Sequence, residues 1–199
     1  KAVGSCTDGL FFSLKALGIK ENDEVIVTSY SYLASATCIL RIGAKPVFVD
    51  VDKNGNMLID EVENKITKKT KAIVYVHLYG YFQNPDKLLK LIKIYKLFLI
   101  EDFAQSLGAK YKSNYAGSLG HVSCTSFDPT KVLSAPGSGG MVFTNNNDLR
   151  IKIKKMRYHG KNSNGDHDLL GINSQLSSIN ASCLLVKLKY LKKYEKKRI

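Results

Sequence analysis

Residues 97–109, LFLIEDFAQSLGA, join an apolar run to a polar turn. Residues 97–100 are all apolar, and such runs are typical of strands that are buried on both faces of a parallel sheet. The strand pattern ends at Asp102, so this carboxylate is expected at the carboxyl end of a buried strand. Open α/β sheets bind their ligands at that edge. The stretch therefore predicts both a parallel sheet and a ligand site beside it.

The same strand pattern recurs along the chain and alternates with segments of helical period. Further apolar runs lie at residues 24–28, 46–50, 72–77, 122–127 and 140–144, and helices are expected at 7–17, 84–95 and 177–198. Thr7 is the expected cap of the first helix, and Pro85 the first residue of the second. Such alternation indicates an α/β fold with right-handed crossovers.

Composition places the chain among soluble globular proteins. It has 199 residues, of which 44% are hydrophobic and 24% charged, enough for one large core. No apolar run approaches the roughly 20 residues of a membrane-spanning helix, and the N-terminal KAVGSCTDGL lacks the features of a secretory signal. None of the four cysteines forms a CxxC pair. We therefore expect no metal site, no disulfide and a reducing, cytoplasmic setting.

The net charge of +13, from 30 Lys and Arg against 17 Asp and Glu, raises the question of nucleic-acid binding. Lysines are scattered along the chain and gather only in KLKYLKKYEKKRI (187–199). No zinc-finger or basic-zipper spacing accompanies them. A solvated, Lys-rich surface is the simpler interpretation, and a positive field also suits a small substrate that carries phosphate.

Three segments carry candidate chemistry. VGSCTDGL (3–10) opens a helix, and the backbone N–H groups of a helix start bind phosphate well. Asp102 ends the strand described above. CTSFDPTK (124–131) brings Ser126 and Lys131 into one loop, and a lysine in a dry pocket forms a Schiff base because it loses its proton easily. Each has an ordinary alternative: a capped helix, a structural carboxylate or a solvated lysine.

Together the three segments supply what pyridoxal phosphate needs. The helix start would hold the phosphate, the carboxylate would keep the pyridine nitrogen protonated, and the lysine would bind the aldehyde. No GxxxxGK[ST] loop occurs and no GxGxxG follows a strand, which argues against a P-loop and a Rossmann fingerprint. The four histidines have no metal-ligand spacing either.

At this level of detail the chain resembles the DegT/DnrJ/EryC1/StrS family of sugar aminotransferases, pyridoxal phosphate enzymes that act on nucleotide-linked keto-sugars. The resemblance runs over the whole chain in order. It is carried by SCTDGL (5–10), DEVIVTSYSYLASA (23–36), GAKPVFVDVD (43–52), KAIVYVHLYG (71–80), IEDFAQSLGA (100–109), SFDPTK (126–131), GGMVFTN (139–145), RYHG (157–160) and GINSQLSSINA (171–181). It implies the large domain of a fold type I enzyme, with a mostly parallel seven-stranded sheet flanked by helices.

Matched position by position, the resemblance implies a role for each candidate residue around the cofactor ring. Lys131 would be the Schiff-base lysine and the proton shuttle. Asp102 would pair with the pyridine nitrogen. Gln105 would contact the ring hydroxyl, and Tyr32 would stack on the ring.

The resemblance also implies how the phosphate is bound. Cys6, Thr7 and Ser126 match the phosphate-binding positions, and Asn173 matches an asparagine that reaches the phosphate of the neighbouring subunit's cofactor. That last role implies a homodimer with shared active sites. Two positions depart from the family, which often has Gly where Cys6 stands and Arg where Gln175 stands. The family chain is also longer, so residues 1–199 are expected to be the cofactor-binding large domain without an N-terminal segment and a small C-terminal domain.

The implied reaction is a transamination in two halves. An amino acid, expected to be glutamate, gives its amino group to the cofactor, which then aminates a keto-sugar attached to a nucleoside diphosphate, as in polysaccharide biosynthesis. Lys131 would act as acid and base in both halves. Two alternatives stay open: a pyridoxal phosphate-dependent sugar dehydratase, in which histidine typically replaces the lysine, and an inactive or truncated relative. We expect no nucleic-acid partner and no membrane partner.

Overall fold

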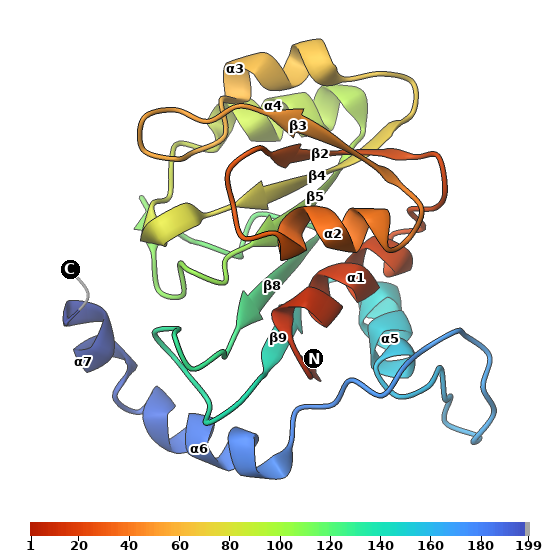
Figure 1. Cartoon of the computed structure of the whole chain (residues 1–199), viewed down its shortest axis with the longest axis vertical. Coiled ribbons are helices and arrows are strands. Elements are labelled where there is room, and N and C mark those ends of the chain that lie inside the picture. Colours follow the sequence, from red (N-terminus) through yellow and green to blue (C-terminus); the bar gives the residue numbers. More distant parts are fainter. Residues whose placement is uncertain (198–199) are drawn as a thin grey trace.

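The computed structural model describes residues 1–197, and its centre is a seven-stranded sheet (Figure 1). The strand order is β1-β9-β8-β5-β4-β2-β3. Neighbouring strands from β8 to β3 run parallel, whereas β9 is antiparallel to both β8 and β1. The expected α/β class with a mostly parallel seven-stranded sheet is therefore confirmed. The strands are β1 (Ala2–Val3), β2 (Glu24–Thr28), β3 (Lys45–Val49), β4 (Thr70–Val76), β5 (Phe98–Asp102), β8 (Val122–Ser126) and β9 (Gly140–Phe143).

Helices cover both faces of this sheet. Figure 1 shows α3 and α4 on one side and α1 and α2 on the other. A small hairpin, β6 (Lys110–Tyr111) and β7 (Asn114–Tyr115), lies outside the main sheet. The helices are α1 (Cys6–Ala16), α2 (Ala34–Leu40), α3 (Ile59–Val62), α4 (Asp86–Tyr95), α5 (Asn147–Met156), α6 (Ser178–Leu188) and α7 (Leu191–Lys196), with 3-10 turns η1 (Glu63–Lys65) and η2 (Leu78–Gly80).

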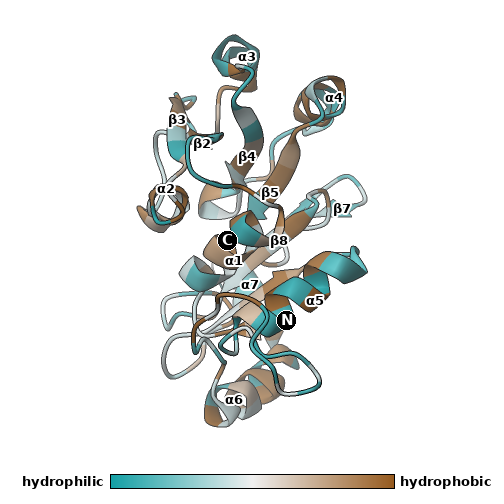
Figure 2. Ribbon diagram, turned by 90° about the vertical axis from the view of Figure 1, so that its right-hand side faces the viewer, coloured by the Kyte–Doolittle hydropathy of each residue, from teal (hydrophilic) through white to brown (hydrophobic). Residues whose placement is uncertain are grey.

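Strand β2 shows why the central strands have continuous apolar runs. All five of its residues are buried. Val25 and Val27 belong to the hydrophobic cluster that contains α1, α2 and α5, whereas Ile26 belongs to the cluster that contains α3 and α4. Successive side chains of a strand point to opposite faces, so the middle of a strand with helices on both sides is apolar at consecutive positions. The polar residues of β2, Glu24 and Thr28, stand at its two ends. The hydrophobic colouring of β4 and β5 between the helices in Figure 2 shows the same arrangement.

Most expected elements occur within two residues of their predicted bounds. Two differences concern the N-terminal region. Helix α1 is capped by Ser5, whose Oγ accepts a hydrogen bond from the N–H of Asp8 at 3.1 Å, and not by Thr7, which lies in the first turn. Strand β1 was not predicted, because two residues are too few to show a period.

The expected helix over residues 177–198 is two helices. Helix α6 ends at Leu188 and α7 begins at Leu191, with Tyr190 between them at φ −109° and ψ 9°, outside helical geometry. Arg198 lies outside the described residues. Leu184 of α6 and Leu191 of α7 pack with Phe127 and Leu133. The two helices are thereby joined to the loop that follows β8.

The carboxyl ends of the central strands lie side by side. Asp102 at the end of β5 pairs with Val76 of β4 and with Cys124 of β8. The loops after β4, β5 and β8 therefore leave the sheet at the same edge. Among residues 1–197, no helix has the length and apolar character needed to cross a membrane.

Candidate active site

A cavity of about 420 Å³ lies where the start of α1 meets the loops after β5 and β8. It contains candidate residues from four distant parts of the sequence. Asn173 is the one predicted site residue that does not line it. The predicted residues that line it are Cys6, Thr7, Tyr32, Asp102, Gln105, Ser126 and Lys131.

Asp102 forms a buried part of the wall of this cavity. Its Oδ2 accepts a hydrogen bond from the Ser35 hydroxyl at 2.9 Å, and its Oδ1 accepts one from the N–H of Ala104 at 3.1 Å. Burial raises the pKa of the Asp102 carboxyl, and these two hydrogen bonds and the charge of Lys131 oppose that rise. A buried carboxylate gains most from a cationic partner. The position therefore suits a protonated pyridine nitrogen.

The Cys6 thiol lies beside this carboxylate, with Sγ 4.0 Å from Asp102 Oδ1. Burial, followed by the negative charge of Asp102, raises the pKa of the Cys6 thiol well above its ordinary value. The thiol is therefore neutral at physiological pH and brings no second negative charge to the cavity.

Lys131 is presented by a turn whose own side chains hold it in shape. The Asp128 carboxylate accepts hydrogen bonds from the N–H of Thr130 at 3.0 Å and from its hydroxyl at 2.7 Å. These bonds, and to a lesser degree the Lys131 charge, lower the pKa of Asp128. The N–H of Lys131 donates to the Asp128 carbonyl at 2.9 Å. Within residues 1–197, Lys131 forms no salt bridge, so its amine is available to a bound molecule.

The start of α1 forms the opposite end of the cavity. The first N–H groups of a helix have no partner inside the helix, and Ser5 satisfies the one on Asp8. Cys6 and Thr7, the first two residues of α1, line the cavity together with Ser126. Gly140 permits this arrangement, because a Cβ there would lie 2.6 Å from the backbone nitrogen of Cys6. The result is a site suited to a phosphate.

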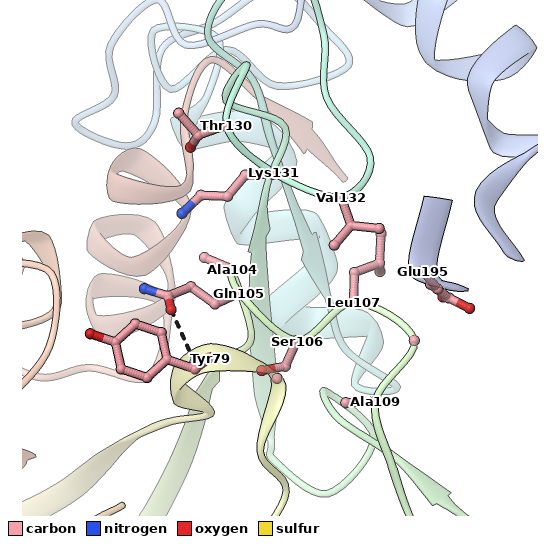
Figure 3. A pocket seen from close by; sticks show the side chains of 12 residues that line it. Tyr79, Ala104, Gln105, Ser106, Leu107, Ala109, Thr130, Lys131, Val132 and Glu195 are labelled. Carbon is pink, nitrogen blue, oxygen red and sulfur yellow. Dashed lines mark hydrogen bonds between the residues drawn. The ribbon is translucent and has the colours of Figure 1, made fainter. Parts of the chain in front are cut away.

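Gln105 has its side-chain amide oriented by a neighbour. Its Oε1 accepts a hydrogen bond from the backbone N–H of Tyr79 at 3.0 Å (Figure 3). Its Nε2 is thus the group turned toward Lys131, and it can donate to an oxygen of a bound ring. The predicted contact of Gln105 with the ring hydroxyl therefore has a suitable donor in Nε2. Tyr79 itself was not predicted.

Tyr32 and Asn173 occupy different places relative to this cavity. Tyr32 is 75% exposed at its rim, where one face of a bound ring would meet it. Asn173 pairs with Tyr158 in an isolated bridge outside the cavity. The neighbouring Ser174 donates from its hydroxyl to Asp8 Oδ2 at 2.8 Å. The role of Asn173 toward a second subunit stays a prediction.

Two further side chains shape the same edge of the sheet and were not predicted. Glu101 is fully buried on the face opposite to Asp102 and accepts hydrogen bonds from the N–H groups of Gly117, Leu119 and Gly120 at 2.9, 2.7 and 2.6 Å. His77 Nε2 lies 2.8 Å from its Oε1. Strand alternation in the Glu101–Asp102 doublet was the available signal. One acid anchors a loop while the next faces the cavity.

A second cavity of about 510 Å³ adjoins the first (Figure 3). The two cavities share Ala104, Gln105, Thr130 and Lys131. The second is otherwise lined by Tyr79, Gly80, residues 106–109, Val132 and Glu195. No group of three or more His, Cys, Asp or Glu side chains among residues 1–197 could hold a metal ion.

An α/β sheet that carries a helix start suited to phosphate, a buried carboxylate and a lysine at one edge is the arrangement typical of pyridoxal phosphate-dependent enzymes. The residues present fit each part of that cofactor. The chain belongs to the DegT/DnrJ/EryC1/StrS aminotransferase family, whose model matches residues 1–199. Members of this family use pyridoxal phosphate as their cofactor.

Characterised relatives are similar over almost the whole of this chain. It is 42% identical to a UDP-N-acetyl-3-dehydro-alpha-D-glucosamine 3-aminotransferase of Acidithiobacillus ferrooxidans, over 96% of this chain and 52% of the relative. It is 40% identical to a UDP-2-acetamido-2-deoxy-3-oxo-D-glucuronate aminotransferase of Pseudomonas aeruginosa, over 92% of this chain and 51% of the relative. The chain thus spans about half the length of these relatives.

Solved structures agree with this assignment. DesV of S. venezuelae superposes with a TM-score of 0.92 at 36% identity, over 96% of this chain and 52% of that chain. NtdA of Bacillus subtilis with bound cofactor PMP superposes with a TM-score of 0.89 at 31% identity, over 96% of this chain and 44% of that chain.

Proposed function

We propose that this protein transfers an amino group from an amino acid, with glutamate the expected donor, to a keto-sugar linked to a nucleoside diphosphate. The observation that carries the proposal is the meeting of Lys131, Asp102 and Gln105 with the start of α1 in one cavity. The similarity to two aminotransferases named for UDP-linked 3-keto-sugars supports the substrate class. An intact Lys131 favours transamination over the dehydratase alternative.

Each residue has one task in this reaction. Pyridoxal phosphate, when bound, supplies an aldehyde that exchanges amino groups and a ring that withdraws electrons from the carbon that loses its proton. Lys131 Nζ moves that proton as base and then as acid. Asp102 holds the proton on the ring nitrogen, and Gln105 Nε2 donates to the ring hydroxyl oxygen. The N–H groups of Cys6 and Thr7 hold the phosphate.

Three further features belong to the proposal. Residues 1–199 would form the cofactor-binding large domain. Two copies would associate as a homodimer, with Asn173 reaching the partner's phosphate, which accounts for its position outside its own cavity. The protein would act in the cytoplasm, in polysaccharide biosynthesis, and its four cysteines, all free in the structure, suit a reducing compartment.

The test is the visible absorbance of the purified protein with pyridoxal phosphate, before and after addition of glutamate. We expect a band from the lysine-bound cofactor that disappears when glutamate is added, and no such band in Lys131→Ala. Lys87→Ala is the matched control, because Lys87 is an exposed lysine paired with Asp60 away from the cavity. Subsequent addition of a UDP-linked 3-keto-sugar should restore the band.

Three results would contradict the proposal. A glutamate-dependent change that persists in Lys131→Ala would place the reactive lysine elsewhere. A stable band that no amino acid and no nucleotide-linked sugar alters would indicate the inactive-relative alternative. Release of water from the sugar without its amination would indicate the dehydratase.

A further inference from the structure

Lys131 lines two adjoining cavities, and only one of them has the groups that fit the cofactor. The first holds Asp102 and the start of α1. The second adjoins Lys131 and Gln105 and extends from Tyr79 on one side to Leu107, Val132 and Glu195 on the other. A substrate whose proton Lys131 moves must lie against the lysine amine. With the cofactor in the first cavity, the second is the adjoining space that remains for the acceptor.

Tyr79 forms the side of the second cavity that faces Gln105 (Figure 3). Its backbone has a φ of 53°, the left-handed conformation that a tyrosine rarely adopts. Its N–H is the donor that orients Gln105. Strained residues of this kind persist where the surrounding structure holds them, and they gather at functional sites.

The Tyr79 ring is held by a second tyrosine. Its side chain is 69% exposed, and its hydroxyl lies 3.1 Å from the hydroxyl of Tyr30. Tyr30 is itself supported by Gly55, where an added Cβ would lie 3.5 Å from the Tyr30 ring and 2.9 Å from Leu78. The loop of Gly55 thus lies close to Tyr30 and to Leu78, the residue before Tyr79, and the hydroxyl pair joins the two tyrosines.

The lining of the second cavity indicates which part of the acceptor it takes. Lys131 is the single cationic residue among those described there, and most of the remaining wall is backbone or small side chains. A diphosphate would need more positive charge. A sugar ring has apolar C–H faces and hydroxyl edges, which suit an aromatic ring with a polar tip.

We propose that Tyr79, held in place by Tyr30, is a specificity-determining residue that stacks on and orients the sugar ring of the acceptor in the second cavity. This inference rests on the proposed function and deepens it. The amino-acid donor is smaller and reacts at the same lysine, so it depends on Tyr79 much less. The two half-reactions should therefore respond differently when Tyr79 is changed.

The experiment measures the two half-reactions separately by stopped-flow absorbance on the cofactor-loaded full-length protein. Glutamate is the probe for the first half, and UDP-2-acetamido-2-deoxy-3-oxo-D-glucuronate is the probe for the second. Tyr79→Asn removes the ring but keeps the backbone N–H, and asparagine tolerates the left-handed conformation. We expect kcat/KM for the sugar to fall roughly tenfold to hundredfold, and kcat/KM for glutamate to change less than about threefold.

Tyr79→Phe and Tyr30→Phe each remove one hydroxyl of the same pair, and both should lower kcat/KM for the sugar in the same direction by a smaller factor. Tyr81→Phe is the control, because Tyr81 is an exposed neighbour that lines neither cavity. Equal losses of kcat/KM in both half-reactions would mean that Tyr79 acts by orienting Gln105 and the cofactor, and would overturn the inference. An unchanged kcat/KM for the sugar would overturn it as well. If the wild-type protein aminates no nucleotide-linked sugar, the proposed function itself is wrong.

Discussion

Asp102 has three hydrogen-bond donors, the Ser35 hydroxyl, the N–H of Ala104 and the more distant Cys6 thiol, and almost no contact with solvent before any cofactor is considered. Burial raises its pKa despite those donors. The folded protein without cofactor therefore binds a proton at Asp102 more tightly than the unfolded chain does. By linkage, the free energy of unfolding falls as pH rises from the pKa of an aspartate in the unfolded chain to the raised pKa of Asp102 in the folded protein. Asp102 thus lowers stability at neutral pH until a cation offsets its charge.

This argument predicts the effect of Asp102→Asn on the cofactor-free protein. The amide has nearly the same shape and no charge, so the free energy of unfolding of the variant should exceed that of the wild type at pH 8. The advantage should shrink as pH falls toward about 4, near the ordinary pKa of an aspartate. Urea denaturation at several pH values measures it. An advantage that grows toward acidic pH would show that the carboxylate is stabilised in the folded state.

Residue patterns in the sequence were enough to predict that Lys131 and Asp102 lie at one edge of the sheet, because each is at or just beyond the end of a recognisable strand. They were not enough to identify Ser35 or Tyr79. Ser35 meets Asp102 across 67 positions of sequence, and the importance of Tyr79 comes from a backbone angle. Contacts between distant segments have no local periodicity to predict them.

The strands illustrate which elements the sequence could predict. Strand β2 coincides with its predicted range, because its centre, residues 25–27, is a continuous apolar run between two buried polar residues, Glu24 and Thr28. Helix α2 was not predicted, since it has seven residues and its N-cap residue, Leu33, makes no side-chain capping bond. Helix starts without a capping side chain and strands of two residues leave no signal at the sequence level.

At the edge of the sheet, Glu101 joins elements that otherwise meet only through loops. It accepts three backbone N–H groups and faces His77 with no solvent access. Glu101→Gln turns an NH₂ group toward some of these donors and leaves them unsatisfied. Each buried donor without a partner costs about 1–3 kcal/mol of stability. We expect the free energy of unfolding to fall by at least about 2 kcal/mol, measured by urea denaturation.

Glu63→Gln is the matched control for this prediction. Glu63 is exposed and accepts a hydrogen bond from the Tyr95 hydroxyl at 2.8 Å. Exposed substitutions of this kind usually change stability by no more than about 0.5 kcal/mol. Equal effects of the two substitutions would mean that the Glu101 network contributes nothing beyond a surface contact.

For the molecule as a whole, the alternation of strands and helices predicted the α/β class, and resemblance predicted which residues meet. The second cavity could not be predicted either way. It depends on the break between α6 and α7 and on Gly108, where a Cβ would overlap the Glu195 carboxylate. Both are details of tertiary packing.

The position of Asn173 leads to a prediction for the assembled protein. The segment that carries it is attached to the start of α1, because the Ser174 hydroxyl bonds both Asp8 and the N–H of Gly4. Asn173 itself lies outside the cavity of its own chain. If it serves the partner's phosphate, Lys131→Ala and Asn173→Ala subunits should complement each other in a mixed dimer. The site with an intact lysine would then receive its asparagine from the other subunit.

Co-expression of the two variants tests this arrangement through turnover. Random pairing makes half of the dimers mixed, and each mixed dimer in a two-fold assembly has one intact site, so roughly a quarter of wild-type turnover should return. Each variant alone should have much less, and light scattering should report a dimer. If Asn173 acted within its own subunit, no mixed site would be complete and turnover would not exceed the average of the two variants. The recovery of turnover in the mixed dimers therefore depends on which subunit supplies the asparagine. A fully active monomer would contradict the shared site directly.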